Sequence, residues 1–235
     1  MKKLFLIIIS VFFTSFATQL NGQNRIAVTL EEFTSLYVSG SVNIELVPSR
    51  SHEMTITARN GQPEEVEYEI KNGKLKIKTR PDLKKENEIS IKLPYSMLTH
   101  LTAASGALIN SRQDLKSKEL ELKVFSGGKI ELSVDAKFID AKVTQLSDII
   151  LYGKTESQNV VANTGGNYLA YDLECEDTYA KASSGAQIKV RAKRKIKVLA
   201  STSGFIGYIG DPQISSTKTS LGGEIASYKT NPMIE

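Results

Sequence analysis

The stretch ELELKVFSGGKIELSV, residues 119–134, decides the fold. Apolar residues alternate with charged or polar residues on both sides of the glycine pair at 127–128. A period of two places the apolar set on one face of an extended strand and the polar set on the other. The stretch therefore predicts two strands joined by a kink. The expected core positions are Leu120, Leu122, Val124, Ile130, Leu132 and Val134.

The same pattern recurs along the rest of the chain. Aligned on small residues, the kinks fall at Gly106, Gly127, Ser147, Gly165, Gly185, Gly204 and Gly222, with 18 to 21 residues between neighbours. Short repeats of this kind are typical of a β-solenoid, in which a bent strand pair buries its apolar face only by stacking on further copies. We therefore predict an all-β, parallel β-helix-like solenoid over residues 98–235. Leu169 and Tyr208 are among the positions expected to face inward.

Residues 23–97 depart from the regular repeat. Gly40 lies in the same kink pattern, but Asn72-Gly73 stands between two alternating stretches and is a strong signal for a type I′ turn. We expect an antiparallel hairpin over residues 66–79. Because the open end of a solenoid needs protection from edge pairing, we expect these N-terminal strands and the hairpin to cap it. A modified start of the solenoid itself is the alternative.

Residues 1–22 have the features of a secretory signal peptide. Two lysines precede an apolar run over residues 4–13, and small or polar residues follow it. The run is too short to cross a membrane as a helix. We expect cleavage after Ala17 or Gly22. The mature chain should then be exported, to the periplasm, the cell surface or the medium, without a transmembrane span.

Charge and cysteine content exclude some classes of protein. Loss of Lys2 and Lys3 reduces the 30 basic residues to 28, against 26 acidic ones, so the mature chain has a net charge of +2. Such a balance argues against a dedicated nucleic-acid-binding protein. The single cysteine, Cys175, cannot form an internal disulfide, and we expect it to be a small buried residue.

One basic run is a candidate ligand-binding surface. It contains Lys189, Arg191, Lys193, Arg194, Lys195 and Lys197. Such a run can bind an acidic polysaccharide, the phosphates of lipopolysaccharide or a nucleic acid. Apolar residues alternate with it, however, so its simplest interpretation is the outward face of two strands joined by a basic corner. It lacks the interleaved aromatic residues of a single-strand nucleic-acid groove.

An acidic cluster around Cys175 is the second candidate. Asp172, Glu174 and Glu176 share one face of a strand and can form a weak cation-binding patch, although a solvated acidic corner is the simpler interpretation. We expect His52 in a solvated turn and His100 in structural packing beside Leu101. No residue set predicts a catalytic, cofactor or metal site.

The chain resembles a known family in three places. These are VSGSV at 38–42 with the alternating strand that follows, LKIKT at 75–79, and the start of the regular repeats at 101–106. Their order is similar to that of the "putative auto-transporter adhesin, head GIN domain" family, a domain of unknown function common in Bacteroidetes. The resemblance covers residues 33–227. It implies a right-handed β-helix-like fold and a location in the cell envelope, and it supplies no catalytic residues.

The function predicted from the sequence is that of an exported, non-enzymatic β-solenoid, adhesin-like or structural, that binds a glycan or another envelope component. The alternative is a carbohydrate-active enzyme, pectin lyase-like or a glycoside hydrolase, on a β-helix. A third possibility is a structural module that self-associates through its ends. The last repeat, ISSTKTSLGGEIAS at 214–227, is rich in serine and threonine, so a monomer is favoured over an end-to-end dimer.

Overall fold

The computed structural model describes residues 24–59, 62–79 and 88–229 and consists almost entirely of strands. The first seven strands are β1 (Asn24–Thr29), β2 (Ser35–Ser39), β3 (Asn43–Pro48), β4 (Glu53–Arg59), β5 (Glu67–Lys71), β6 (Lys74–Lys78) and β7 (Glu88–Tyr95), and a 3₁₀ helix covers Pro63–Glu65. The next six are β8 (His100–Ala104), β9 (Leu108–Ser111), β10 (Leu115–Phe125), β11 (Lys129–Val143), β12 (Asp148–Ala162) and β13 (Asn167–Ala170). The last six are β14 (Leu173–Ala182), β15 (Gln187–Arg191), β16 (Lys195–Ser201), β17 (Phe205–Ile209), β18 (Ile214–Ser220) and β19 (Glu224–Tyr228). The expected signal peptide, residues 1–22, lies outside the described residues.

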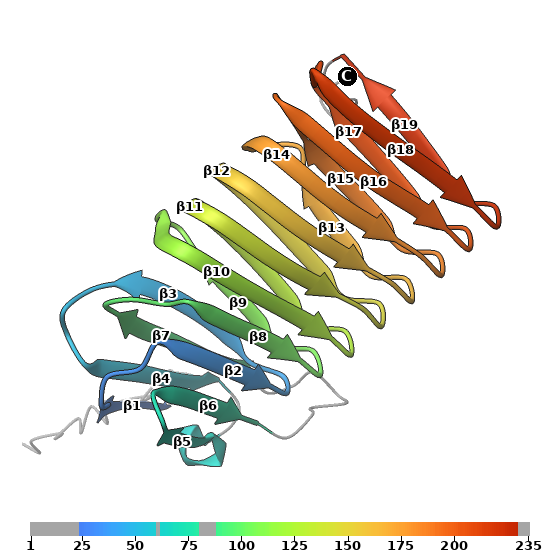
Figure 1. Cartoon of the computed structure of the whole chain (residues 1–235). Coiled ribbons are helices and arrows are strands. Elements are labelled where there is room, and N and C mark those ends of the chain that lie inside the picture. The colour runs from blue at the N-terminus through green and yellow to red at the C-terminus, as the bar shows by residue number, and fades with distance from the viewer. Residues whose placement is uncertain (1–23, 60–61, 80–87, 230–235) are drawn as a thin grey trace, which may run out of the picture.

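The strands stack as a β-solenoid of about 7 turns, so the predicted fold is confirmed (Figure 1). Each rung crosses two parallel sheets, which we name after one strand of each. The β16 sheet contains β8, β10, the second halves of β11 and β12, β14, β16 and β18. The β15 sheet contains β9, the first halves of β11 and β12, β13, β15, β17 and β19. Within the described part of the chain, no helix is long and apolar enough to cross a membrane.

Tight turns connect the two sheets along one edge of the stack (Figure 1). Each has two successive residues with positive φ: Ser105-Gly106, Ser126-Gly127, Gln145-Leu146, Thr164-Gly165, Ser184-Gly185, Thr202-Ser203 and Leu221-Gly222. This is type I′ geometry, which explains the frequent glycine at the second position. The kinks predicted at Ser147 and Gly204 are wrong by one residue. Leu146 and Ser203 take the left-handed conformation instead, at a cost of about 1–2 kcal/mol each, and their amides are held by carbonyls of the next turn at 3.2 and 3.3 Å.

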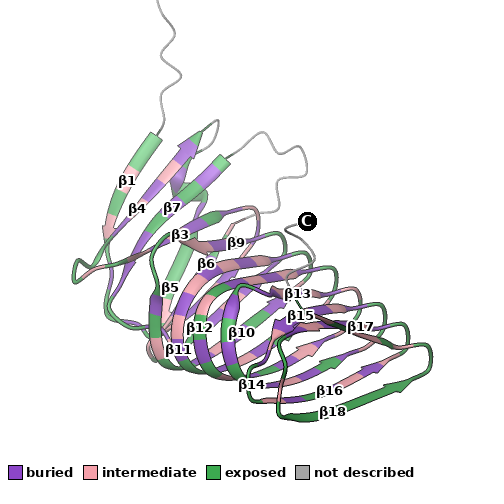
Figure 2. Ribbon diagram, turned by 90° about the horizontal axis from the view of Figure 1, so that it is seen from above, coloured by how far each residue is buried: buried purple, intermediate pink, exposed green. Residues whose placement is uncertain are grey.

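The core lies between the two sheets and follows the predicted alternation (Figure 2). All six core positions predicted from residues 119–134 are at most 1% exposed. Leu169 was predicted to face inward, but Tyr168 and Ala170 occupy the inward positions of β13. β13 ends at Ala170, and the turn at Tyr171-Asp172 shifts the alternation, so an alternation carried back from Leu173 across this turn assigns Leu169 to the wrong face. Tyr208 is only half-buried, because it lies near the end of the stack.

One polar network crosses this apolar core. The hydroxyl of Tyr168 donates to Gln158 Oε1 at 2.7 Å, and Gln158 Nε2 donates to Thr178 Oγ1 at 2.9 Å. Thr178 in turn donates to the backbone carbonyl of Arg191 at 2.8 Å. All three side chains are fully buried. The network satisfies these groups, as burial in a low-dielectric interior requires.

Antiparallel strands cover the N-terminal end of the stack (Figure 1). The rung β2–β3 lies between β6–β7 and β8–β9 and pairs in parallel with both. Beyond it, β5 pairs antiparallel with β6, β4 with β7, and β1 with β4. The hairpin predicted for residues 66–79 is confirmed as β5–β6, with φ of 52° at Asn72 and 69° at Gly73. The boundary between 23–97 and 98–235 stays a prediction, since strands from both segments alternate in the stack.

The C-terminal end finishes in a polar rung. All seven residues of β18 are exposed, as Figure 2 shows. Its inward positions, Ser215, Thr217 and Thr219, lie in register with Ile196, Val198 and Ala200 of β16. Hydroxyl groups therefore end the core at the β16 sheet, whereas Ile225 of β19 still packs against it beside Ile206. The polar half makes this part of the open edge a poor template for further strands. The monomer favoured from the sequence stays a prediction that light scattering tests.

Candidate functional site

The solenoid divides the basic run between its two sheets. Lys189 and Arg191 lie on β15, whereas Lys195 and Lys197 lie on β16. Apolar residues between them face the core, so the interpretation as two outward strand faces joined by a corner is confirmed. Arg191 turns back to the backbone, where its Nε donates to the carbonyl of Tyr171 at 2.9 Å. The run therefore does not form a single continuous patch.

At the corner, the basic and acidic candidates neutralise each other. Lys193 Nζ lies 2.8 Å from Glu174 Oε2, and Arg194 Nη2 lies 2.6 Å from Asp177 Oδ2. The hydrogen bond from Lys193 lowers the pKa of Glu174 below its usual value and raises that of the lysine. A glycosidase general acid needs a raised pKa, so the shift of Glu174 is in the opposite direction.

The remaining acidic candidates are exposed at the same corner. Asp172 and Glu176 flank Glu174 on the outer side of the strand, while Cys175 between them is buried. Burial raises the pKa of the Cys175 thiol to about 11, as expected for an inert structural cysteine. Among the residues that the structure describes, no group of three histidine, cysteine or carboxylate side chains is arranged to hold a metal ion. A ligand-binding role for the acidic cluster stays a prediction.

The corner continues this pairing of opposite charges along the stack. Lys116, Asp135, Lys154 and Glu174 occupy one register position on successive rungs. Lys154 Nζ lies 3.4 Å from Asp135 Oδ2. A hollow of about 900 Å³ lies here, but lysines and carboxylates both line it. The corner therefore has no strong preference for an anion or a cation.

A groove on the outer face of the β16 sheet has a different character. It has a volume of about 370 Å³ and crosses β12, β14, β16 and β18. Its charged lining residues are Lys181, Lys197 and Lys218, and no carboxylate of the described residues lines it. No ion-pair partner of these three lysines is found within the described ranges. The groove therefore presents a locally positive surface that favours an anionic ligand.

Apolar and aromatic surface lies between the lysines of the groove. Leu199 separates Lys181 from Lys218 in the strand register. Beside them, Tyr179 is half-buried, and the ammonium group of Lys195 lies 5.3 Å from its ring centroid. An aromatic ring beside cations can stack on an apolar ligand face while the cations bind its charges. This combination suits a sugar ring that carries an acidic group.

Sequence reasoning identified only part of this groove. Of its lining residues, Lys197 belongs to the predicted basic run, but Tyr179, Lys181 and Lys218 come from other rungs. Stacking brings them together because equivalent residues of neighbouring rungs lie side by side. The available signal was the position in the repeat: Lys181 and Lys218 each lie three residues before their turn pairs, which begin at Ser184 and Leu221.

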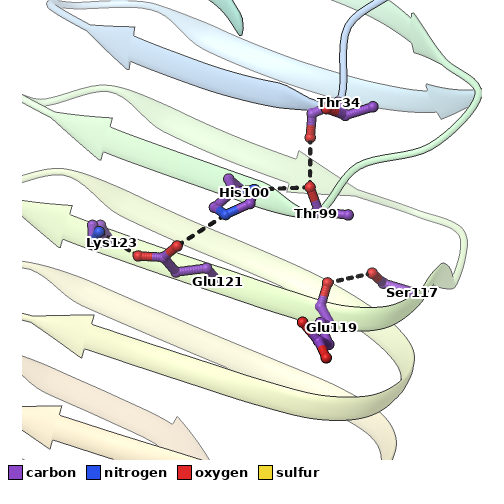
Figure 3. A network of polar contacts seen from close by, with 7 residues as sticks. All are labelled: Thr34, Thr99, His100, Ser117, Glu119, Glu121 and Lys123. Atoms are coloured by element: carbon purple, nitrogen blue, oxygen red, sulfur yellow. Dashed lines mark hydrogen bonds and ion pairs between the residues drawn. The ribbon is translucent and has the colours of Figure 1, made fainter. Parts of the chain in front are cut away.

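Toward the N-terminus, the same outer face carries a polar network in which a carboxylate pairs with basic side chains (Figure 3). His100 was predicted to pack structurally, but its side chain is 54% exposed and its Nε2 lies 3.1 Å from Glu121 Oε2. Strand alternation explains the error, because Leu101 takes the inward position. Lys123 also pairs with Glu121 and lowers the pKa of that carboxyl. His52 is exposed, as predicted.

Comparison with known proteins places the fold among adhesin-like proteins. Residues 32–212 match the family model described as "putative auto-transporter adhesin, head GIN domain". A putative adhesin from Bacteroides fragilis matches with a TM-score of 0.79 at 17% identity, over 88% of this chain and 97% of that one. A putative adhesin from Parabacteroides merdae matches with a TM-score of 0.71 at 16% identity, over 88% and 96%.

A protein from Parabacteroides distasonis, described as a "putative lipid binding protein", matches with a TM-score of 0.66 at 17% identity, over 88% of this chain and 97% of that one. At 16–17% sequence identity, the similarity to these three structures shows only that the fold is shared. Among curated proteins, none matches the chain.

Proposed function

This chain belongs to the "putative auto-transporter adhesin, head GIN domain" family, and we propose that it is an exported, non-enzymatic protein that binds an acidic glycan of the cell envelope. The observation that carries the proposal is the groove, whose described lining includes three lysines and a tyrosine but no carboxylate. The proposal includes export through the N-terminal segment. It narrows the wider expectation of a glycan or other envelope component to an anionic glycan.

The groove has the chemistry that such a ligand requires. Exposed ammonium groups attract carboxylate or sulfate groups and lose much of that attraction as salt screens them. Leu199 and the Tyr179 ring lie beside the lysines on the surface of the groove, whereas the Val160, Ala180 and Val198 side chains beneath them face the core. The Leu199 and Tyr179 side chains can contact the C–H faces of a sugar ring. An anionic lipid headgroup has the same charge, and we favour the glycan because the groove is a shallow hollow across four strands that offers the Tyr179 ring and Leu199 for contact with a sugar ring.

A carbohydrate-active enzyme is the less favoured alternative. Glu174 and Asp177 are each engaged by a basic partner, and the lowered pKa of Glu174 is unsuitable for protonating a leaving group. Among the residues that the structure describes, no carboxylate lines the groove that we propose as the binding site. We therefore expect binding without turnover. Incubation with acidic polysaccharides, followed by chromatography of the products, should show no depolymerisation.

Calorimetric titration with hyaluronan oligosaccharides tests the binding proposal. Lys181→Ala and Lys197→Ala should each weaken binding by roughly two- to fivefold, the effect of removing one exposed ion pair. Lys189→Ala is the matched control, because this lysine belongs to the same basic run but lies on the β15 sheet. The Lys189→Ala variant should bind the oligosaccharides with the same affinity as the unmodified protein. If Lys189→Ala weakens binding and the two groove variants do not, the site has been placed on the wrong sheet.

A further inference from the structure

A single register position on the outer face of the β16 sheet joins six successive rungs. Strand pairing aligns Lys123 with Lys142, then Val161, Lys181, Leu199 and Lys218. We call this row the lysine column. Every member is exposed or half-buried, so its side chains lie on the surface of the sheet. The column is perpendicular to the strands and therefore runs along the axis of the solenoid.

Cationic and aliphatic side chains alternate along most of this column. From Lys142 to Lys218, each lysine is followed by one aliphatic residue, Val161 or Leu199, and then by the next lysine. Neighbouring rungs are about 4.8 Å apart, so the lysines repeat about every 9.6 Å. Lys142, like Lys181 and Lys218, has no ion-pair partner among the described residues. The surface thus repeats a positive site and an apolar site with a period of two rungs.

This periodicity identifies the kind of ligand that fits. We infer that the protein binds a linear polysaccharide laid along the lysine column, with one acidic group on every second sugar unit. The inference rests on the proposed function and adds the direction and the repeat of the ligand. A sugar unit in an extended chain advances by a distance similar to one rung. Acidic units then lie at Lys142, Lys181 and Lys218, while the neutral units between them lie on Val161 and Leu199.

The contribution of Lys142 distinguishes binding along the lysine column from binding in the groove alone. It lies on β11, one rung beyond the residues that line the groove. A short oligosaccharide seated over Lys181 and Lys218 does not reach it. A longer one that follows the column must pass over Val161 and then reach Lys142. The effect of Lys142 should therefore depend on the length of the ligand.

The experiment compares hyaluronan tetrasaccharide and decasaccharide, which carry one carboxylate per disaccharide, in low-salt calorimetric titrations of the purified protein. Binding of the decasaccharide should be roughly fivefold tighter or more. Lys142→Ala should weaken decasaccharide binding by roughly two- to fivefold, as for one exposed ion pair, and leave tetrasaccharide binding unchanged. Lys189→Ala should change neither value. Circular dichroism should show that these surface variants remain folded.

Two further probes test the repeat and the source of the charge. An oligogalacturonate of ten units carries an acid on every sugar, and it should bind no more tightly than the hyaluronan decasaccharide. Tighter binding would mean that charge density alone governs affinity and would overturn the inferred repeat. Binding to phosphatidylglycerol vesicles in place of both oligosaccharides would assign the column to a lipid surface.

The remaining outcomes separate the two proposals. If both hyaluronan lengths bind equally and Lys142→Ala has no effect, the groove still binds an acidic glycan, but the inferred path along the column is wrong. If no acidic oligosaccharide binds at all, the proposed function itself fails.

Discussion

The change Tyr168→Phe removes one hydroxyl from the centre of the solenoid and leaves the ring in place. That hydroxyl donates to Gln158 Oε1 at 2.7 Å, and both side chains are fully buried. Without the donor, a buried carbonyl oxygen has no partner, which costs about 1–3 kcal/mol. For a chain of this size, each kcal/mol lowers the melting temperature by about 2–4 °C. We therefore expect a clear loss of stability from the loss of a single oxygen atom.

Urea unfolding followed by far-ultraviolet circular dichroism measures this loss. Tyr152→Phe is the matched control, because Tyr152 is 40% exposed and lies on the outer face of β12. Its effect should stay within about 0.5 kcal/mol. The double change Tyr168→Phe with Gln158→Met should cost less than the sum of the two single changes, because it removes the unpaired oxygen as well as its donor. Equal midpoints for the two phenylalanine variants, or strictly additive effects, would refute the proposed role of the network.

Three further predictions concern the core and the surface. Leu122→Ala should lower the unfolding free energy by about 2–5 kcal/mol, against less than about 0.5 kcal/mol for the exposed Lys142→Ala, as urea titrations can compare. Iodoacetamide should label Cys175 only after unfolding, because the buried thiol has a pKa of about 11; rapid labelling of the folded protein would contradict this. Because Lys123 lowers the pKa of Glu121, the ionised carboxylate stabilises the fold above the usual glutamate pKa, and this contribution is lost as the pH falls through the lowered value. The stability difference between the protein and Glu121→Gln, below about 1 kcal/mol, should therefore vanish in acid, and a difference that persists there has another cause.

The sequence alone determined the architecture, because the solenoid is encoded by local alternation repeated many times. In each strand, the alternation of apolar and polar residues identifies the inward face, and each turn needs residues that tolerate positive φ. The six core positions of residues 119–134 and the hairpin at Asn72-Gly73 could therefore be predicted without a structure. The prediction was wrong by one residue at two turns, Gln145-Leu146 and Thr202-Ser203, whose second residue is not glycine. There the sequence does not mark which residues turn. It was also wrong at Leu169, because the turn at Tyr171-Asp172 shifts the alternation between β13 and β14.

Only the tertiary structure decided which charges share a surface. Lys193 and Arg194 appeared to belong with Lys197, but the corner pairs them with Glu174 and Asp177 of the preceding rung. The groove instead joins residues from separate rungs, which the chain brings together only by stacking at about 4.8 Å. Contacts between rungs depend on the register of each turn, and an error of one residue moves a side chain to the other face of its sheet. The sequence thus determined the face of most strands, and the stacked register decided which lysines line the groove.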